Sequence, residues 1–411
     1  MNHFFIDTER DELITWSLLI DDIKNSSTYN PYCKSGSYYE VFKQIITSLI
    51  IGEEIILLDS DFTDLELEKL TGYSNYDAFT KIIDKDVITI PRNREELLKL
   101  LQNKNDDWKI TLFTSGTTGI PKKVTHDFNS ITRFAKISKH NSTCVWGYAY
   151  NPTHMAGIQV FFQALLNGNS IVRIFGLSPD KIYLAIKENE ITHISATPTF
   201  YRLLLPCTEI FQSVKRLSSG GEKFHEKTIS SLKACFPNAK ITNIYASTEA
   251  GTLLASEDDV FSIKPESKHL IRIENDELLI HSSLMGRSEM SFDEWYRTGD
   301  LIEIITKKPF KFRFISRKSD MINVGGYKVN PLEVEEFILN LSGVKNARVY
   351  SKANSVLGSI ICCDIVRNNE ELSESSIRKI LQSKIQEFKI PRIIRFVDEL
   401  STTRTGKIKR N

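Results

Sequence analysis

The sequence predicts an α/β protein with a large N-terminal domain over residues 1–315 and a small α+β domain over residues 316–411. The chain is longer than the domains that usually form around a single hydrophobic core, which indicates more than one domain. Through the first half, segments with helical apolar spacing alternate with short β-branched apolar segments. From about residue 269 the pattern changes to alternating apolar and polar residues, and a last unit of about 95 residues has the usual size of a domain.

The alternation in the first half predicts layers of helices on largely parallel sheets, with a site at the carboxyl ends of the strands. Helices are predicted at residues 11–23, 38–50, 95–103, 129–140, 155–168 and 178–190. Strands are predicted at residues 53–61, 108–113, 142–150, 170–175, 192–198 and 241–245. Asp127 or Asn129 is a candidate N-cap of the helix at 129–140.

The later segments predict sheets of a different kind. Residues 269–284 alternate around Asn275 and Asp276, a pair typical of a hairpin turn. Pro331 suits the first turn of a helix at 331–341. The small domain continues with strands at 344–350, 359–366 and 393–399 and a helix at 373–388.

Composition excludes several classes of protein. Hydrophobic residues make up 41% and charged residues 26%, as in ordinary globular proteins. The 53 basic and 52 acidic residues leave a net charge of +1, which gives no global attraction to nucleic acid or anionic membranes. No segment approaches the roughly 20 apolar residues of a membrane span. The N-terminal MNHFFIDTERDE has acids where a signal peptide is apolar, so we expect residence in the cytoplasm.

The six cysteines are scattered, without C-x-x-C pairs or histidines at metal spacing. The sequence therefore predicts neither a structural zinc site nor a disulfide framework. Cys362 and Cys363 lie in an apolar strand and point to opposite faces, where we expect buried, reduced thiols.

Residues 111–123, TLFTSGTTGIPKK, contain the clearest chemical signal in the chain. Gly116 and Gly119 permit positive φ, so successive N–H groups can form a cradle for phosphate oxygens. Pro121 and the missing Gly-Lys-Ser/Thr ending exclude the common P-loop, and a plain Ser/Thr/Gly turn is the alternative. The hydroxyl and ammonium groups around the cradle belong to Thr114, Ser115, Thr117, Thr118, Lys122 and Lys123.

This string resembles the signature loop of the adenylate-forming superfamily, which includes acyl-CoA synthetases, aryl-CoA ligases and the adenylation domains of peptide synthetases. Seven motifs in the family's order span residues 111–411. The resemblance implies a large domain of layered sheets that holds ATP and the acyl group, joined by a hinge to a small mobile domain. Family members are typically longer at the N-terminus, by about the size of a small subdomain.

IYASTE, residues 244–249, resembles the family's Tyr-Gly-x-Thr-Glu motif. The resemblance implies that Tyr245 packs on adenine, Thr248 contacts the α-phosphate and Glu249 helps to ligate Mg²⁺, a hard cation that carboxylates suit. Ala246 replaces the usual Gly, and we hypothesise that its methyl group narrows the acyl pocket. Without the resemblance, a lone Glu is ordinarily a solvated surface charge.

Two further motifs complete the predicted nucleotide site. WYRTGDL resembles the Tyr-x-Thr-Gly-Asp motif, which implies that Asp300 accepts hydrogen bonds from the ribose hydroxyls. SSGGEKF resembles the segment along adenine and the acyl pocket, with Gly220, Gly221 and Glu222 as its nucleotide-binding residues. As isolated strings, both are typical of ordinary turns.

NPTHMAG resembles the family's Pro-x-x-His-x-x-Gly stretch and implies a catalytic position for His154, between the phosphate loop and the acyl pocket. A lone histidine is more often structural. Amino-acid-activating members usually carry an Asp near this point. This chain has no acidic residue between Trp146 and Asp180, which favours a carboxylic acid without an α-amino group.

Residues 314–336 resemble the hinge that begins the family's C-terminal domain. The resemblance implies that Arg317 reaches the ribose or phosphate and that the Gly325–Gly326 loop lines the approach of the thiol. Ser316 replaces the usual Gly, and Ser319 stands where the pivot is commonly Asp or Lys.

STTRTGKIKRN resembles the family's final Pro-x-Thr-x-x-Gly-Lys motif, with Ser401 in place of Pro. A lysine in a charged tail would otherwise be a solvated cation. The resemblance implies that Lys407 is catalytic and bridges the attacking carboxylate and the nucleotide, where its charge offsets their repulsion.

The implied reaction has two steps, with ATP and Mg²⁺ as cofactors. A carboxylate attacks the α-phosphate to give an acyl-adenylate, and a thiol then displaces AMP to give a thioester. Rotation of the small domain between the steps would exchange Lys407 for the 325–326 loop. No carrier domain follows Asn411, so we expect coenzyme A, or the phosphopantetheine of a separate carrier protein, as acceptor. The alternatives are a stand-alone enzyme that loads a carrier protein and a non-catalytic nucleotide-binding relative.

Overall fold

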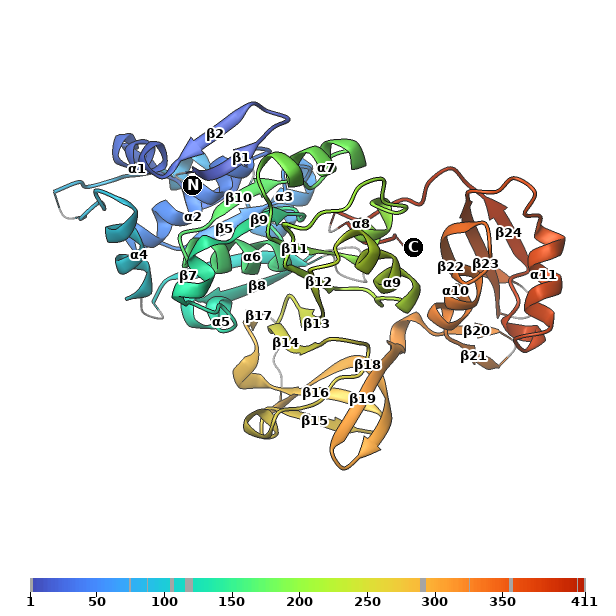
Figure 1. Cartoon of the computed structure of the whole chain (residues 1–411). Coiled ribbons are helices and arrows are strands. Elements are labelled where there is room, and N and C mark those ends of the chain that lie inside the picture. The colour runs from blue at the N-terminus through green and yellow to red at the C-terminus, as the bar shows by residue number, and fades with distance from the viewer. Residues whose placement is uncertain are drawn as a thin grey trace.

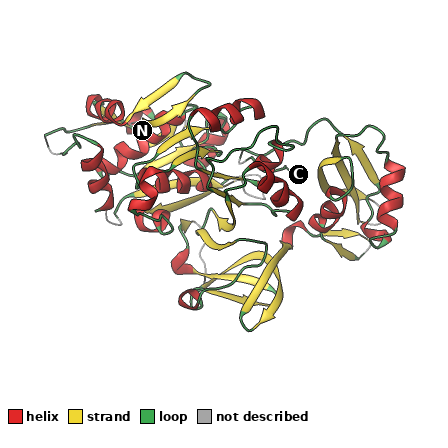
Figure 2. Ribbon diagram, viewed as in Figure 1, coloured by secondary structure: helices red, strands yellow, loops and turns green. Residues whose placement is uncertain are grey.

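The computed structural model confirms the α/β class and the division into a large N-terminal and a small C-terminal domain (Figure 1). The large domain combines two layered sheets with helices and a third, antiparallel sheet (Figure 2). The division at residue 316 stays a prediction. The structure describes residues 3–73, 75–86, 88–103, 107–114, 121–288, 293–324, 326–354, 358–404 and 406–409.

An eight-stranded sheet forms the centre of the large domain, in the order β14-β13-β12-β11-β9-β10-β1-β2. The six strands from β13 to β1 are parallel, and an antiparallel strand closes each edge. This arrangement confirms the predicted parallel sheet. The strands are β1 (His3–Asp7), β2 (Glu12–Thr15), β9 (Val145–Tyr148), β10 (Ser170–Arg173), β11 (His193–Ala196), β12 (Arg216–Gly220), β13 (Lys240–Ser247) and β14 (Gly251–Ser256).

A second, five-stranded sheet has the order β17-β8-β7-β5-β4. Its strands are β4 (Tyr32–Lys34), β5 (Ile55–Leu58), β7 (Lys109–Thr114), β8 (Lys122–Asp127) and β17 (Arg287–Ser288). A short pair, β3 (Thr28–Tyr29) with β6 (Lys81–Ile82), lies apart from it. The predicted strands at 53–61 and 108–113 thus belong to this layer.

Helices cover both faces of the central sheet, because each sheet face has to bury its apolar side chains. One core joins the two sheets through helices, and Phe42 stacks on Phe161 at a centroid distance of 4.5 Å within it. Its helices are α1 (Trp16–Asn25), α2 (Tyr38–Ile51), α4 (Arg94–Gln102), α5 (Phe128–Thr132) and α6 (Met155–Leu165). The opposite face packs against α7 (Pro179–Glu188), α8 (Pro198–Leu203) and α9 (Glu226–Cys235). A short helix, α3 (Asp64–Thr71), follows β5.

The antiparallel sheet has the order β15-β16-β18-β19 and its own core. Asn275 and Asp276 have φ of 52° and 59°, which confirms the predicted hairpin turn. The strands are β15 (Ile271–Glu274), β16 (Glu277–His281), β18 (Trp295–Lys307) and β19 (Phe310–Arg317).

The C-terminal domain packs two helices against a three-stranded sheet around a separate core. Cys362 and Cys363 are free and buried on its middle strand, as expected. The elements are β20 (Ile322–Val324), β21 (Tyr327–Val329), α10 (Pro331–Leu339), β22 (Val344–Asn354), β23 (Gly358–Arg367), α11 (Glu374–Gln382) and β24 (Ile393–Phe396).

Two predicted helices are wrong in part. Residues 11–23 divide into β2 and α1 because the Thr15 hydroxyl accepts a hydrogen bond from the Leu18 N–H and begins the helix there. The helix predicted at 129–140 ends at Thr132, and the apolar side chains of Phe134 and Ile137 beyond it are exposed. Asp127 is the N-cap that begins this short helix.

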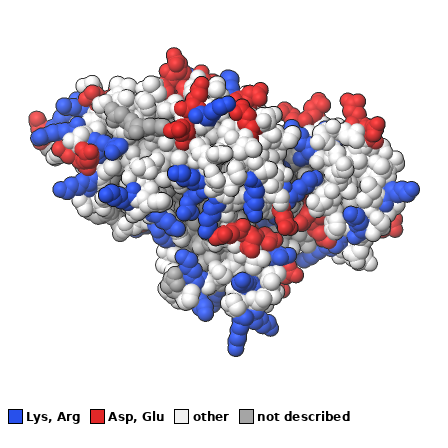
Figure 3. Space-filling model, in the orientation of Figure 1, with Lys and Arg blue, Asp and Glu red and all other residues white. Residues whose placement is uncertain are grey.

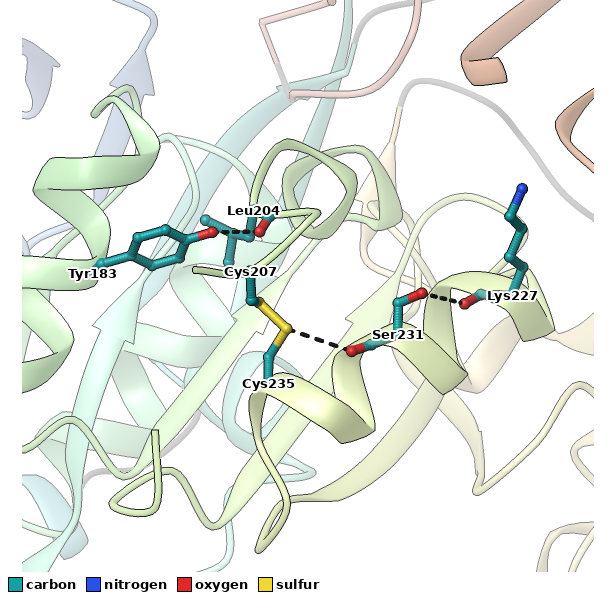
Figure 4. The surroundings of a disulfide bond; sticks show 6 residues. All are labelled: Tyr183, Leu204, Cys207, Lys227, Ser231 and Cys235. Carbon is teal, nitrogen blue, oxygen red and sulfur yellow. Dashed lines mark hydrogen bonds between the residues drawn. A yellow bond between two sulfur atoms is a disulfide. The ribbon is translucent and has the colours of Figure 1, made fainter. Parts of the chain in front are cut away.

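The prediction of no disulfide is wrong for one pair. Cys207, in the loop after α8, is bonded to Cys235 at the end of α9, with Cα atoms 5.9 Å apart (Figure 4). The two residues are 28 positions apart, and only the packing of α8 and α9 on the same sheet face brings them together. Tyr183 from α7 donates a hydrogen bond to the Leu204 carbonyl beside this bridge.

Both Lys and Arg and Asp and Glu side chains are present across the face shown in Figure 3, in keeping with the net charge of +1. Within the described ranges, we find no helix that is long and apolar enough to cross a membrane.

His193, on the central strand β11, should make stability depend on pH. Burial, together with the nearby charge of Arg216, lowers its pKa to about 4. An unfolded histidine binds its proton near pH 6.5, so the stabilisation is complete above that pH and is lost as the pH falls toward 4. We expect wild type to lose on the order of 2 kcal/mol more than His193→Gln between pH 7 and pH 5, measured by urea denaturation. Equal losses in the two proteins would contradict this assignment.

Candidate active site

The end of the chain returns from the C-terminal domain to the large domain and places Lys407 against Gly221 (Figure 1). A Cβ added at Gly221 would lie 2.5 Å from Cε and 2.9 Å from Nζ of Lys407. Gly221 also has φ of +86°, a conformation that other residues rarely adopt. Lys407, which the sequence predicts to be catalytic, therefore lies in contact with Gly221, which it predicts to allow close backbone approach.

Backbone contacts hold the tail on both sides of Lys407. The Thr197 hydroxyl donates to the Gly406 carbonyl at 3.0 Å, and the Ile408 N–H donates to Glu222 Oε1 at 2.9 Å. Glu222 Oε2 accepts from both the N–H and the hydroxyl of Thr199, at 3.1 and 2.6 Å. Glu222 thus connects the start of α8 to the tail, whereas its predicted contact with the nucleotide stays a prediction.

The Lys407 ammonium group lies in an environment that disfavours its charge. Burial lowers its pKa, and the carboxylate of Glu222 is the largest influence that raises it. Arg317 lowers the pKa, while Asp300 and Glu249 raise it. Four side chains that the sequence assigned to nucleotide or metal binding therefore act on this lysine.

Asp300 is the centre of a second group of contacts. Arg317 Nε donates to its Oδ1 at 2.8 Å, and the Tyr245 hydroxyl donates to its Oδ2 at 2.5 Å. A carboxylate offers about four acceptor positions, so Asp300 can still accept from two ribose hydroxyls. Burial raises the pKa of Tyr245, and Asp300 raises it further, so this phenol remains a donor.

The ring of Tyr245 stacks on Phe314 with centroids 4.1 Å apart and an interplanar angle of 16°. Phe314 belongs to β19, so the stack joins the central sheet to the antiparallel sheet. The predicted packing of Tyr245 on adenine would use the ring's other face or its edge, and it stays a prediction.

The loop after β13 is fixed through its backbone. His126 Nε2 lies 2.8 Å from the Thr248 carbonyl, and the Gly286 N–H donates to the Glu249 carbonyl at 2.6 Å. Burial lowers the pKa of His126, which keeps the ring neutral with its proton on Nε2. These bonds leave the side chains of Thr248 and Glu249 available for ligands. A carboxylate at this point suits Mg²⁺, which is commonly held by one or two carboxylates together with phosphate oxygens.

His154 belongs to a different group of contacts, at the N-cap of α6. Its Nε2 lies 3.1 Å from Oδ2 of Asp59, while the Thr153 hydroxyl and the Asn151 amide donate to Asp59 Oδ1 at 2.5 and 2.8 Å. Burial raises the pKa of Asp59, but the bonds from His154, Thr153 and Asn151 lower it more, so the net shift is downward. The sequence analysis missed Asp59, whose only signal was its position at the end of a predicted strand.

The phosphate loop falls largely outside the described residues, which omit Ser115, Gly116, Thr117, Thr118 and Gly119. The flanking strands are described. β7 ends at Thr114, which pairs with Lys122 at the start of β8. The predicted strand before the loop is therefore confirmed, and Lys122 and Lys123 belong to the strand that follows it.

Gly220 and Gly326 both occupy positions that disfavour a side chain, for different reasons. A Cβ at Gly220 would lie 2.9 Å from the Ile244 carbonyl oxygen. Gly326 has φ of +91°, and its N–H bonds to Asn323, whereas Gly325 lies outside the described residues.

Comparison with known proteins identifies the family. The model of the AMP-binding enzyme family matches residues 49–270, and that of the AMP-binding enzyme C-terminal domain matches residues 333–407. The chain belongs to the AMP-binding enzyme family. The resemblance inferred from the motifs is thereby confirmed, and the matched regions contain Lys407, His154 and the motif at 244–249.

Curated relatives of this AMP-binding enzyme differ in length and in name. It is 26% identical to 4-hydroxybutyrate–CoA ligase 1 of Metallosphaera sedula, over 96% of this chain and 77% of that protein. It is 26% identical to 2-succinylbenzoate–CoA ligase of Listeria monocytogenes, over 73% and 68%. It is 24% identical to bacitracin synthase 3 of Bacillus licheniformis, where the match covers 80% of this chain but only 6% of the much longer relative.

Solved structures show the same fold at low sequence identity. The o-succinylbenzoate CoA synthetase of Bacillus subtilis, in complex with an acyl-adenylate, has a TM-score of 0.71 at 18% identity, and the match covers 99% of this chain and 94% of that one. ATP-bound MatB of Rhodopseudomonas palustris has a TM-score of 0.74 at 16% identity, with the same coverage.

Gly221→Ala should displace the Lys407 loop. The added methyl group would overlap Lys407, and overpacking of this kind costs about 1–3 kcal/mol, or roughly fivefold and more in local opening. We expect amide hydrogen exchange at Ile408 to accelerate by at least that factor. Gly72→Ala is the matched control, because Gly72 has φ of +78° with no atom within 4 Å. Equal Ile408 exchange in both variants and wild type would show that the contact does not hold the loop.

Proposed function

We propose that this AMP-binding enzyme activates a carboxylic acid as its acyl-adenylate and transfers the acyl group to the thiol of coenzyme A. The observation that carries the proposal is the position of Lys407, which lies against Gly221 within the electrostatic influence of Asp300 and Glu249. The names of its relatives support it, since several are CoA ligases.

In the first step a carboxylate oxygen bonds to the α-phosphorus of ATP while the bond to the β-phosphate oxygen breaks, releasing pyrophosphate. Lys407 would lie between the two anionic reactants and offset their repulsion. Asp300 would bind the ribose hydroxyls, with Arg317 and Tyr245 fixing the carboxylate. Glu249 would hold Mg²⁺, which neutralises charge on the phosphates when bound. His154, held by Asp59, would border the acyl group.

In the second step the thiol gives up its proton to solvent, its sulfur attacks the acyl carbonyl, and AMP leaves with the electrons of the broken carbon–oxygen bond. The small domain would rotate so that the loop at Gly326 replaces Lys407. A separate carrier protein is the alternative acceptor, and the similarity to bacitracin synthase 3 supports this alternative. A cytoplasmic location, where ATP and coenzyme A are supplied, is part of the proposal.

The acid itself should lack an α-amino group. The segment from Trp146 to Asp180 has no acidic side chain that could pair with an ammonium group. The nearby Asp59 already accepts hydrogen bonds from Asn151 and Thr153 and lies 3.1 Å from His154 Nε2. The hypothesis that Ala246 narrows the acyl pocket remains open, and an Ala246→Gly variant with unchanged acid preference would contradict it.

Acid-dependent ATP–pyrophosphate exchange across aryl, short-chain, long-chain and amino acids tests this function. We expect exchange with one class of acid that lacks an α-amino group. Lys407→Ala should reduce it by roughly 10²–10³, the range for loss of one group that stabilises transition-state charge. Thioester assays with coenzyme A and with a carrier protein then identify the acceptor. ATP binding without exchange for any acid would favour the non-catalytic relative.

The lowered pKa of Lys407 predicts a pH effect on the same reaction. The lysine has to be charged, so we expect the basic limb of kcat/KM for ATP to lie below the ordinary lysine value of about 10.4. Glu222→Gln removes the largest influence that raises this pKa and should move the limb to lower pH. A Lys407→Arg variant with residual activity should lack the limb, because its guanidinium stays charged. An unmoved limb in Glu222→Gln would contradict the assignment.

A further inference from the structure

Arg404 joins the tail to a part of the large domain that none of the seven motifs includes. Its Nε lies 2.7 Å from Asp61 Oδ2, and its Nη2 lies 3.5 Å from Glu66 Oε1. Its guanidinium carbon lies 4.8 Å from the centroid of the Phe62 ring, within the range of a cation–π contact. All three partners belong to residues 59–66, between β5 and the first turn of α3, which we name the latch segment.

The latch segment is ordered by contacts within the large domain. Glu66 Oε2 accepts from the N–H and the hydroxyl of Thr63, which form the capping box of α3, so its other oxygen is already directed at Arg404. Phe62 is buried in a cluster with Leu58 and Phe113, and its carbonyl accepts from Lys34. Arg404 therefore meets a preformed surface rather than a loop that it has to order.

The same segment begins with Asp59, which holds His154 through a contact of 3.1 Å. One end of the latch segment thus fixes one predicted catalytic residue, and the other end contacts the tail three residues before Lys407. The latch segment therefore contacts both the tail that carries Lys407 and the side of the site where the acyl group is expected to bind.

We propose that Arg404 is a positioning residue, which holds the Lys407 loop in the adenylation arrangement through its contacts with Asp61, Phe62 and Glu66. The inference rests on the proposed two-step function. Because these contacts exist only while the tail is docked, removing them shifts the population toward the undocked tail. The adenylation step then slows, while transfer from a preformed acyl-adenylate does not.

Other contacts between the domains lie away from the tail. Lys223 pairs with Glu336 at 2.5 Å, and Lys227 donates to the Leu339 carbonyl at 2.8 Å. Both connect the region of α9 to α10. Arg404 differs from them because its contact bears directly on the loop that carries Lys407.

Amide hydrogen exchange tests the proposal without any substrate. Within the tail, the Lys409 N–H donates to the Ser401 carbonyl and the Ile408 N–H donates to Glu222. We expect Arg404→Gln to accelerate exchange at both amides by up to about fivefold, as expected for an ion pair of this exposure. Lys187→Gln is the matched control, since it breaks an exposed pair with Glu209 that lies wholly in the large domain. Unchanged exchange in Arg404→Gln would overturn the proposal, whether or not an acid substrate is known.

Partial reactions and a double-mutant cycle give the second test. With the acid that the panel identifies, Arg404→Gln and Asp61→Asn should each reduce ATP–pyrophosphate exchange severalfold, and the double variant should be little worse than either. The difference from wild type should shrink in 0.5 M salt. Thioester formation from the supplied acyl-adenylate should be undiminished in all variants. Equal loss in both half-reactions, or additive losses in the double variant, would show a general structural role and overturn the proposal.

Discussion

The close approach of a half-buried lysine to a glycine determines how the site is built. Lys407 occupies space that any side chain at residue 221 would fill, so its position depends on the absence of a Cβ there. Burial disfavours the ammonium form, and the carboxylate of Glu222 does most to restore it. Glu222 can do so because Thr199 and the Ile408 N–H fix its oxygens. Gly221 leaves room for Lys407, and Glu222 favours its charged form, so adjacent residues of the chain meet both requirements.

The layered sheet explains why these groups converge. β9, β11, β12 and β13 are parallel neighbours, so their carboxyl ends lie at one edge of the sheet. His154, Thr197, Gly221 and Thr248 all follow those ends within a few residues. A change in the order of these strands would separate them, whereas the identity of most core side chains behind the edge would matter less.

Much of the fold and of the site could be predicted from local patterns, because strands, helices and motif loops are each encoded by adjacent residues. The residues that the sequence analysis missed take their roles from contacts between segments that are distant in the sequence. Asp59 meets His154 across 95 positions, Arg404 meets Asp61 across 343, and Cys207 meets Cys235 only after α8 and α9 pack. The misplaced helix at 11–23 has a local cause, since the cap at Thr15 outweighed a continuous apolar pattern.

The strength of the contact at Arg404 suits the proposed reaction, in which the small domain would move twice in each cycle. The side chains of Arg404 and Asp61 are 34% and 57% exposed, so solvent screens their attraction and its contribution is about 0–1 kcal/mol. A contact of this size biases the docked position severalfold and still opens at little cost. The exposure of the pair therefore fits the proposed two-step reaction, in which the tail would dock and undock in each cycle.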